Sequence, residues 1–212
     1  MKKFLESVRK PDTDVSLWVK ILVSAAVVIV GALLGVFQKW LDGQAFNELP
    51  VLFQMLDLTN FFGRFAIWIL LATIISICAS SPVRASVNTF LFFISMVAGY
   101  YIYCRFVLGF FPGAYAMIWV AMAFASIFLA FICWYAKGNG PIAIIISALI
   151  LGTVSAQTFL ITQGFFIPHM TEVIVWAVTL FVLRRKPKEF AIVFILSIGI
   201  SYVYQLFIPY WG

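Results

Sequence analysis

The sequence predicts an all-α protein, a polytopic bundle of transmembrane helices, and three observations carry this prediction. Of the 212 residues, 64% are hydrophobic and only 10% are charged. The mean hydropathy is +1.08, whereas soluble domains keep their apolar share near one half. The apolar residues fall into runs of about 20, the length of a helix that crosses a bilayer, and charges, glycines and prolines separate these runs.

Seven runs have the length and composition of membrane spans. They cover residues 17–37, 61–79, 89–108, 115–135, 142–161, 165–183 and 190–208. The sixth run is the weakest, because Pro168, His169 and Glu172 interrupt its start and leave a short apolar stretch. We therefore expect seven spans and keep a six-span bundle as the alternative.

Seven spans leave too little chain for a separate soluble domain, so residues 1–212 are predicted to form one membrane-embedded domain. Residues 1–16 form a tail before the first span, and we expect this tail in the cytoplasm. Residues 39–60 form the longest loop, on the outer side. Within it, segment 49–58 mixes apolar and polar side chains and suits a short helix lying at the membrane interface.

The distribution of basic residues predicts the orientation, because cytoplasmic loops are rich in Lys and Arg. If the tail is cytoplasmic, eleven of the fourteen basic residues fall on the cytoplasmic side. Only Lys39, Arg64 and Arg105 fall outside. The sequence thus predicts a multi-pass protein of the bacterial inner (plasma) membrane, with a cytoplasmic amino terminus and an outer carboxyl terminus.

Polar side chains inside the spans gather in the predicted outer half of the membrane. Such groups are costly in a bilayer and face a cavity or one another. The candidate ligand-binding residues are Asn60, Arg64, Tyr101, Tyr103, Arg105, Gln157, His169, Glu172, Trp176 and Gln205. They predict an outward-facing pocket lined by aromatic rings, amides and a few charges.

Chemistry suggests a role for each type of side chain. Arg64 and Arg105 suit an anionic group, and Glu172 suits a cationic or hydroxyl group. The aromatic rings suit stacking, and the glutamines suit hydrogen bonding. The alternative is structural: the two arginines pair with Asp57 and Glu172 and hold helices together.

The sequence offers little support for catalysis or for a cofactor. Its single histidine, His169, cannot build a multi-histidine metal site, and the three cysteines lack metal-site spacing. No recognisable acid and base pair emerges, so we expect a protein that is not an enzyme and has neither metal nor cofactor. A nucleotide-binding motif is also absent, so active transport would need a partner ATPase or an ion gradient.

One segment carries a resemblance to other proteins. It consists of Ser81, Pro82, Val83, Arg84, Ala85, Asn88, Phe90, Phe92, Phe93, Met96, Gly99, Tyr100, Tyr101 and Tyr103. This segment resembles a family of bacterial multi-pass membrane proteins of uncharacterised function, which implies no mechanism. The predicted bundle with an outward pocket also resembles the S components of energy-coupling-factor transporters, which bind a vitamin and dock on an ATP-driven module.

The second resemblance has clear departures. Seven spans are predicted instead of six, the carboxyl terminus is expected outside, and Gly31 and Gly35 lie in the outer part of the first span. These two glycines are spaced for close helix packing, and we expect that packing within the chain.

The leading hypothesis is a small-molecule binding or transport subunit. Its expected partners are the lipid bilayer, a small-molecule ligand and a partner ATPase or membrane complex, without nucleic acid. The alternative is a non-catalytic scaffold or interaction subunit of a larger membrane complex.

Overall fold

The computed structural model describes residues 2–162 and 164–208, and the fold is all-α, as predicted. The α-helices are α1 (Lys2–Val8), α2 (Leu17–Asp42), α3 (Val51–Met55), α4 (Leu58–Phe61), α5 (Phe65–Cys78), α6 (Pro82–Phe106), α7 (Gly113–Trp134), α8 (Gly140–Thr158), α9 (Met170–Val182) and α10 (Pro187–Phe207). Two 3₁₀ turns, η1 (Phe46–Glu48) and η2 (Tyr135–Lys137), complete the described elements.

Five described helices are long and apolar enough to cross a membrane, namely α2, α6, α7 with η2, α8 and α10. The other two predicted spans are apolar but shorter: α5 has 14 residues and α9 has 13. At 1.5 Å per residue each is about 20 Å long, against a hydrocarbon core of about 30 Å. The predicted range 61–79 starts only at Phe65, because α4 and a turn precede it. The predicted range 165–183 starts only at Met170, because residues 165–169 are not helical although most of them are apolar.

Two further boundaries differ from the prediction. Helix α6 begins seven residues before position 89, because the Ser81 hydroxyl caps its start by accepting from the Arg84 amide, and Pro82 fits the first turn. Helix α2 runs to Asp42, so Lys39 belongs to a helix and not to the loop expected over 39–60. The segment expected at the interface holds α3 and α4.

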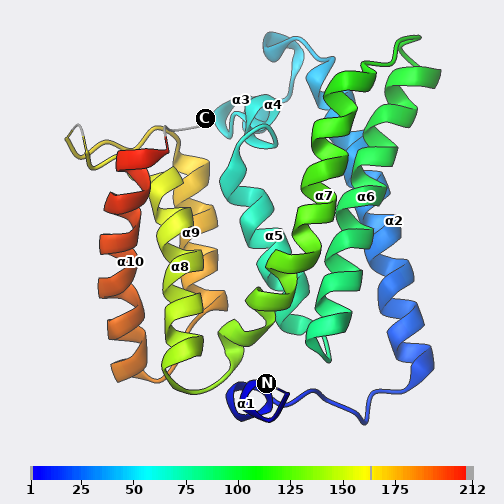
Figure 1. Cartoon of the computed structure of the whole chain (residues 1–212). Helices are drawn as coiled ribbons and strands as arrows, with labels where there is room; N and C mark the ends of the chain where they lie inside the picture. Colours follow the sequence, from blue (N-terminus) through cyan, green and yellow to red (C-terminus); the bar gives the residue numbers. More distant parts are fainter. Residues whose placement is uncertain (1, 163, 209–212) are drawn as a thin grey trace.

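The seven long or apolar helices run in alternating directions along the chain (Figure 1). Helices α2, α6 and α7 pack together on one side, α8, α9 and α10 on the other, and α5 lies between them. Each of the two short helices, α5 and α9, carries the chain from one end of the bundle to the other.

Helices α2 and α6 approach each other with backbone against backbone. A Cβ added to Gly35 would lie 2.0 Å from the Met96 carbonyl oxygen, and one added to Gly99 would lie 2.3 Å from that of Ala32. Gly31 meets Phe92 in the same way. The packing expected of Gly31 and Gly35 is therefore found within the chain, between α2 and α6.

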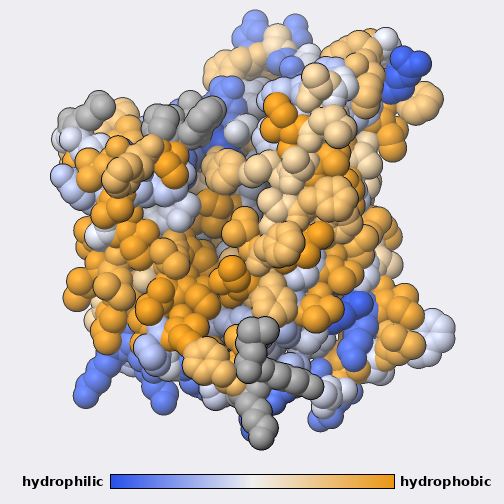
Figure 2. Space-filling view, viewed as in Figure 1, coloured by the Kyte–Doolittle hydropathy of each residue, from blue (hydrophilic) through white to orange (hydrophobic). Residues whose placement is uncertain are grey.

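The surface divides into an apolar belt and two polar ends. Hydrophobic side chains cover the middle of the molecule, and hydrophilic ones gather at the two ends (Figure 2). Many large apolar side chains on the long helices are exposed, such as Leu22 at 65% and Phe128 at 74%. This is the surface of a multi-pass membrane protein, for which lipid is the surrounding solvent.

The two ends differ in charge. The basic end consists of the tail 2–16, the first turn of α2 and the segments around 80–84, 137–139 and 183–189, and it carries eleven basic and four acidic residues of the sequence. The acidic end consists of the end of α2, the segment 43–64 and the loops 105–112 and 159–172, with three basic and four acidic residues. The predicted outer carboxyl terminus, residues 209–212, lies outside the described residues.

Candidate functional site

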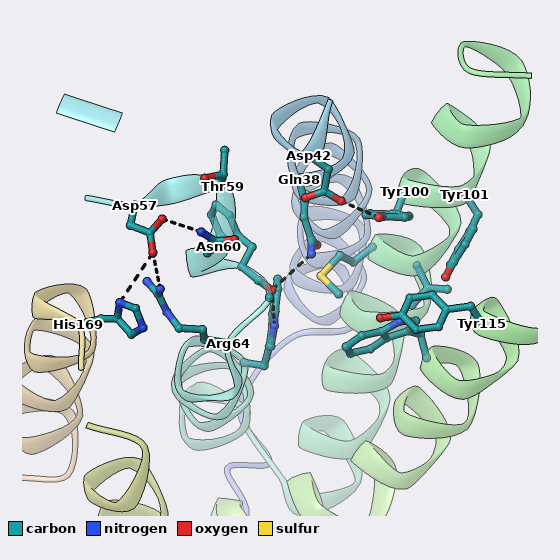
Figure 3. Close-up of a pocket in the computed structure, with 16 residues that line it drawn as sticks. Gln38, Asp42, Asp57, Thr59, Asn60, Arg64, Tyr100, Tyr101, Tyr115 and His169 are labelled. Atoms are coloured by element: carbon teal, nitrogen blue, oxygen red, sulfur yellow. Dashed lines mark hydrogen bonds and ion pairs between the residues drawn. The ribbon is translucent and has the colours of Figure 1, made fainter. Parts of the chain in front are cut away.

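A cavity of about 550 Å³ opens at the acidic end. Its wall comes from the end of α2, segment 57–64, the start of α5, the middle of α6, the start of α7 and His169 (Figure 3). Segments far apart in the sequence thus meet around one space. We call this space the polar cavity.

Arg64 forms one wall of the polar cavity and is almost fully buried. It precedes the first residue of α5, and its Nη1 lies 2.7 Å from Asp57 Oδ2. Its Nη2 donates to Thr171 Oγ1 at 2.8 Å. Its Nε lies 2.5 Å from Glu172 Oε1, with the geometry of an ion pair rather than of an aligned hydrogen bond. The charge of Arg64 is therefore held between two carboxylates.

Three side chains contact the carboxylate of Asp57. Besides Arg64, Asn60 donates to Oδ1 at 2.8 Å, and His169 Nδ1 lies 3.8 Å from Oδ2 (Figure 3). Asp57 has a φ of 47°, in the left-handed region that few non-glycine residues adopt. Its backbone is thus held in a sparsely populated conformation at the point where its carboxylate meets the cavity.

The carbonyl group of Phe62 fixes one side of the polar cavity. It accepts a hydrogen bond from Trp68 Nε1 at 2.9 Å and one from Gln38 Nε2 at 3.3 Å (Figure 3). These bonds link α2, the segment before α5 and α5 itself. The indole of Trp68, which is 7% exposed, is thereby locked in the wall.

Asp42 and Tyr100 form the opposite side. The Tyr100 hydroxyl donates to Asp42 Oδ2 at 2.6 Å, and Lys39 Nζ lies 3.7 Å from the same oxygen. The Asp42 side chain keeps 30% of its surface exposed. A carboxylate at the rim is therefore accessible from the space that the cavity encloses.

Tyr101 lines the polar cavity and has an unsatisfied hydroxyl. Only 6% of the residue is exposed, and no described residue is a hydrogen-bond partner for its hydroxyl. The hydroxyl points toward Tyr115 across the wall (Figure 3). Most buried polar groups in proteins are hydrogen-bonded, so this hydroxyl, which is buried in the wall behind the cavity surface, is an exception.

The polar cavity gathers some of the residues that the sequence singled out. Asn60, Arg64, Tyr101 and His169 line it, and Glu172 lies directly behind Arg64. The buried contacts of Arg64 with Asp57 and Glu172 are those of the helix-locking alternative.

Three other predicted residues form hydrogen bonds between α8, or the loop that follows it, and the neighbouring helices. Gln157 Nε2 lies 3.3 Å from the Tyr204 hydroxyl, and Trp176 Nε1 donates to Ser155 Oγ at 2.9 Å. The Gln205 amide donates to the carbonyl of Phe159 at 2.6 Å and accepts from the amide of Ile161 at 3.0 Å. Gln205 thus holds the chain where α8 ends.

The last two predicted residues lie away from the polar cavity. Tyr103 is half-buried on α6 and is not part of the cavity wall. Arg105 is exposed and borders a separate apolar groove between α6 and α7. The anion-binding pair expected of Arg64 and Arg105 is therefore not gathered at one place.

The sequence-based candidates did not include several residues of the wall. These residues include Gln38, Asp42, Asp57, Trp68, Tyr100, Tyr115 and Trp119. One signal pointed to the first two: Gln38 and Asp42 are four residues apart, so they share a helix face once the first helix is extended beyond position 37.

Comparisons with known proteins identify no family and no homologue for this chain. It matches no protein-family model, no curated protein and no solved structure. The resemblances drawn from segment 81–103 and from the predicted bundle thus stay predictions. The site must be interpreted from its own chemistry.

Proposed function

We propose that this protein is a membrane subunit that binds a small organic cation in the polar cavity. The observation that carries the proposal is that carboxylates and aromatic rings share the wall of one cavity: Asp42 and Asp57 lie there with the rings of Tyr100, Tyr101, Tyr115 and Trp119. The volume of about 550 Å³ is within the usual range of small-molecule sites.

The charges around the cavity favour a cation. Three carboxylates, Asp42, Asp57 and Glu172, face two basic side chains, Lys39 and Arg64. The group therefore carries one excess negative charge when His169 is neutral. Asp42 and Asp57 keep 30% and 28% of their side-chain surface exposed, whereas Glu172 is buried behind Arg64. Of the two exposed carboxylates, Asp42 is the one that is not paired with Arg64.

The aromatic rings favour the same ligand. Tyr100 and Tyr101 pack with ring centroids 5.1 Å apart, and Tyr115 and Trp119 with centroids 6.1 Å apart. All four rings line the cavity. Aromatic faces attract ammonium groups and cover apolar carbon, so the wall suits an amine or a quaternary ammonium with an apolar body.

In this proposal the protein acts by binding and not by catalysis, with the acidic end outside and all seven apolar helices crossing the membrane. Onward movement of the ligand would need a partner ATPase or an ion gradient, because the sequence has no nucleotide-binding motif. A scaffold role, in which the polar residues only stabilise the bundle, is the competing proposal.

Ligand-dependent thermal stability of the purified full-length protein in detergent tests this. Binding to the folded state raises the apparent stability by mass action. Choline, aromatic monoamines and polyamines form one panel, and carboxylates of similar size form the control panel. We expect a shift with at least one cation, and none with the carboxylates.

Two matched pairs of variants locate the site. The shift should disappear in Asp42→Asn and persist in Glu48→Gln, which removes a carboxylate from the loop at the same end. It should shrink in Tyr115→Leu, which removes an aromatic ring from the wall, and persist in Tyr202→Leu, at a residue that is 49% exposed on α10. Absence of a shift across the whole cation panel would overturn the proposal in favour of the scaffold.

A further inference from the structure

A second cavity, of about 310 Å³, lies at the basic end, where the tail passes α2, the start of α6 and the end of α7. We call it the basic cavity. The tail is fixed across this end by backbone hydrogen bonds, from Asn139 N to the Val8 carbonyl at 2.7 Å and from Asp12 N to the Ser80 carbonyl at 2.8 Å. The wall that the tail supplies is therefore a bonded part of the fold.

Two arginines of the basic cavity are held in place by carbonyl and hydroxyl oxygens. Arg9 donates to the carbonyls of Trp134 at 2.6 Å and Ile77 at 2.9 Å, and its guanidinium lies 4.1 Å from the centre of the Trp134 ring. Arg84 donates to the Lys20 carbonyl and to Ser24 Oγ. Both guanidinium groups are oriented by neutral partners, so their positive charge is left uncompensated.

Four cations surround this space without an ion pair. Arg9, Lys10, Lys20 and Arg84 line the cavity, and within the described part of the chain none of them has a carboxylate oxygen within 4 Å. The one carboxylate of the wall, Asp12, accepts instead from the amide of Asp14 at 3.0 Å.

Burial opposes the charge of Arg9, and a nearby arginine at the same end has the carboxylate partner that Arg9 lacks. Burial lowers the pKa of the Arg9 guanidinium, against an opposing effect of the Cys78 thiol. At the same end, Arg185 Nε lies 3.1 Å from Glu189 Oε2, so an ordinary pairing is available there and is used. Four like charges around one cavity repel one another unless an anion joins them.

One wall of the basic cavity is apolar and faces the membrane. Val15, Val19 and Val23 come from the segment before α2 and from its first turns, and Val19 and Val23 are 47% and 44% exposed. The four cations lie at one end of this wall, and the exposed valines extend it toward the hydrocarbon of the membrane. The arrangement matches a molecule with an anionic head and an apolar tail.

We propose that the basic cavity binds the phosphate headgroup of an anionic membrane phospholipid, whose acyl region lies along Val19 and Val23. A soluble phosphate ester shares the headgroup chemistry but leaves the valine wall without a partner. The lipid is therefore the ligand that uses both the four cations and the apolar wall.

Native mass spectrometry of the full-length protein in detergent, titrated with phosphatidylglycerol or phosphatidylcholine, tests this. We expect one phosphatidylglycerol to bind before all others, and phosphatidylcholine to bind without such a step. A basic residue near an anionic headgroup strengthens binding about fivefold, so Lys10→Gln with Lys20→Gln should weaken that first step about 25-fold. Both lysines are at least partly exposed, so the double variant should fold.

The control is Lys186→Gln with Lys188→Gln, which removes two exposed charges from the same end but none from the basic cavity. It should keep the first binding step. Equal loss in both double variants, or equal binding of the two lipids, would overturn the proposal. If glycerol 3-phosphate at millimolar concentration displaces the lipid completely, the site belongs to a soluble phosphate ester and the lipid assignment is wrong.

Discussion

Arg64 at the start of α5 and Glu172 at the start of α9 form an ion pair of 2.5 Å, with only 4% and 2% of their side chains exposed. Thr171, beside Glu172, accepts from the same guanidinium. This pair joins the central helix to the α8–α10 side of the bundle at the acidic end. Breaking a buried pair leaves an uncompensated charge, which costs far more than an exposed pair is worth.

Glu172→Gln should therefore destabilise the protein by about 3 kcal/mol, the low end for a broken buried pair because Asp57 still neutralises Arg64. Unfolding of the detergent-solubilised protein measures this. Glu48→Gln removes a carboxylate from the loop of the same end and should leave the free energy of unfolding unchanged within about 0.5 kcal/mol. Equal stability of Glu172→Gln and the unmutated protein would contradict the role given to this pair.

Tyr101→Phe should raise stability without ligand and leave ligand binding unchanged. The hydroxyl is buried without a partner among the described residues, so its removal relieves a desolvation cost of about 1 kcal/mol. The aromatic ring stays in the wall, so the proposed ligand keeps its contacts. Thermal unfolding with and without the best cation of the panel measures both effects. A lower stability of the ligand-free variant would indicate that the hydroxyl is already satisfied.

Gly35→Ala should destabilise the contact between α2 and α6. The new Cβ would lie 2.0 Å from the Met96 carbonyl oxygen, and backbone cannot move away as a flexible side chain does. Overpacking of this kind costs about 1–3 kcal/mol. In Gly199→Ala the Cβ meets nothing within 4 Å, so this control should be neutral or gain up to about 1 kcal/mol of helix propensity. The comparison fails if both variants melt alike.

Gly138→Ala should loosen the tail from the basic end. Its Cβ would lie 2.5 Å from the Val8 carbonyl oxygen, which the Asn139 amide binds at 2.7 Å. We expect faster proteolysis within residues 2–16 and weaker binding of the first phosphatidylglycerol. Gly113→Ala, whose Cβ makes only ordinary contacts with the Phe111 ring, is the control. Unchanged proteolysis would show that the tail does not depend on this close approach.

The sequence predicts the middle of each span, and it fails at span ends, where apolar residues can lie outside a helix and polar residues inside it. The span expected over 115–135 lies within two residues of α7 at both ends. The start of α6 was missed because Arg84, Ser86 and Asn88 resemble a loop. In the fold Asn88 is 3% exposed and accepts from Ser24 at 2.8 Å, a contact that a single sequence does not reveal.

The candidate site was predicted in the same uneven way. Helical spacing in the sequence places Arg64 near Asp57, and the predicted topology places Glu172 in the same outer half of the membrane. The contact of Arg64 with both carboxylates therefore follows from the predicted topology. Gln157 and Gln205 share that depth but face the α8–α10 side, because periodicity gives a helix face and not the neighbour it contacts. The residues around Arg64 can be told apart from Gln157 and Gln205 only when it is known that α5 packs between the α2–α6–α7 side and the α8–α10 side.

The shortness of α5 and α9 has an electrical consequence. Only about 20 Å of apolar helix lies beneath the start of α5, and the polar cavity opens above it. A membrane voltage falls mainly across this low-dielectric layer. If the cavity binds a cation as we propose, a cation entering from the acidic end crosses little of the field, so its binding should be nearly independent of voltage. Passage to the basic end would carry the full charge through it, at about 2.3 kcal/mol per 100 mV.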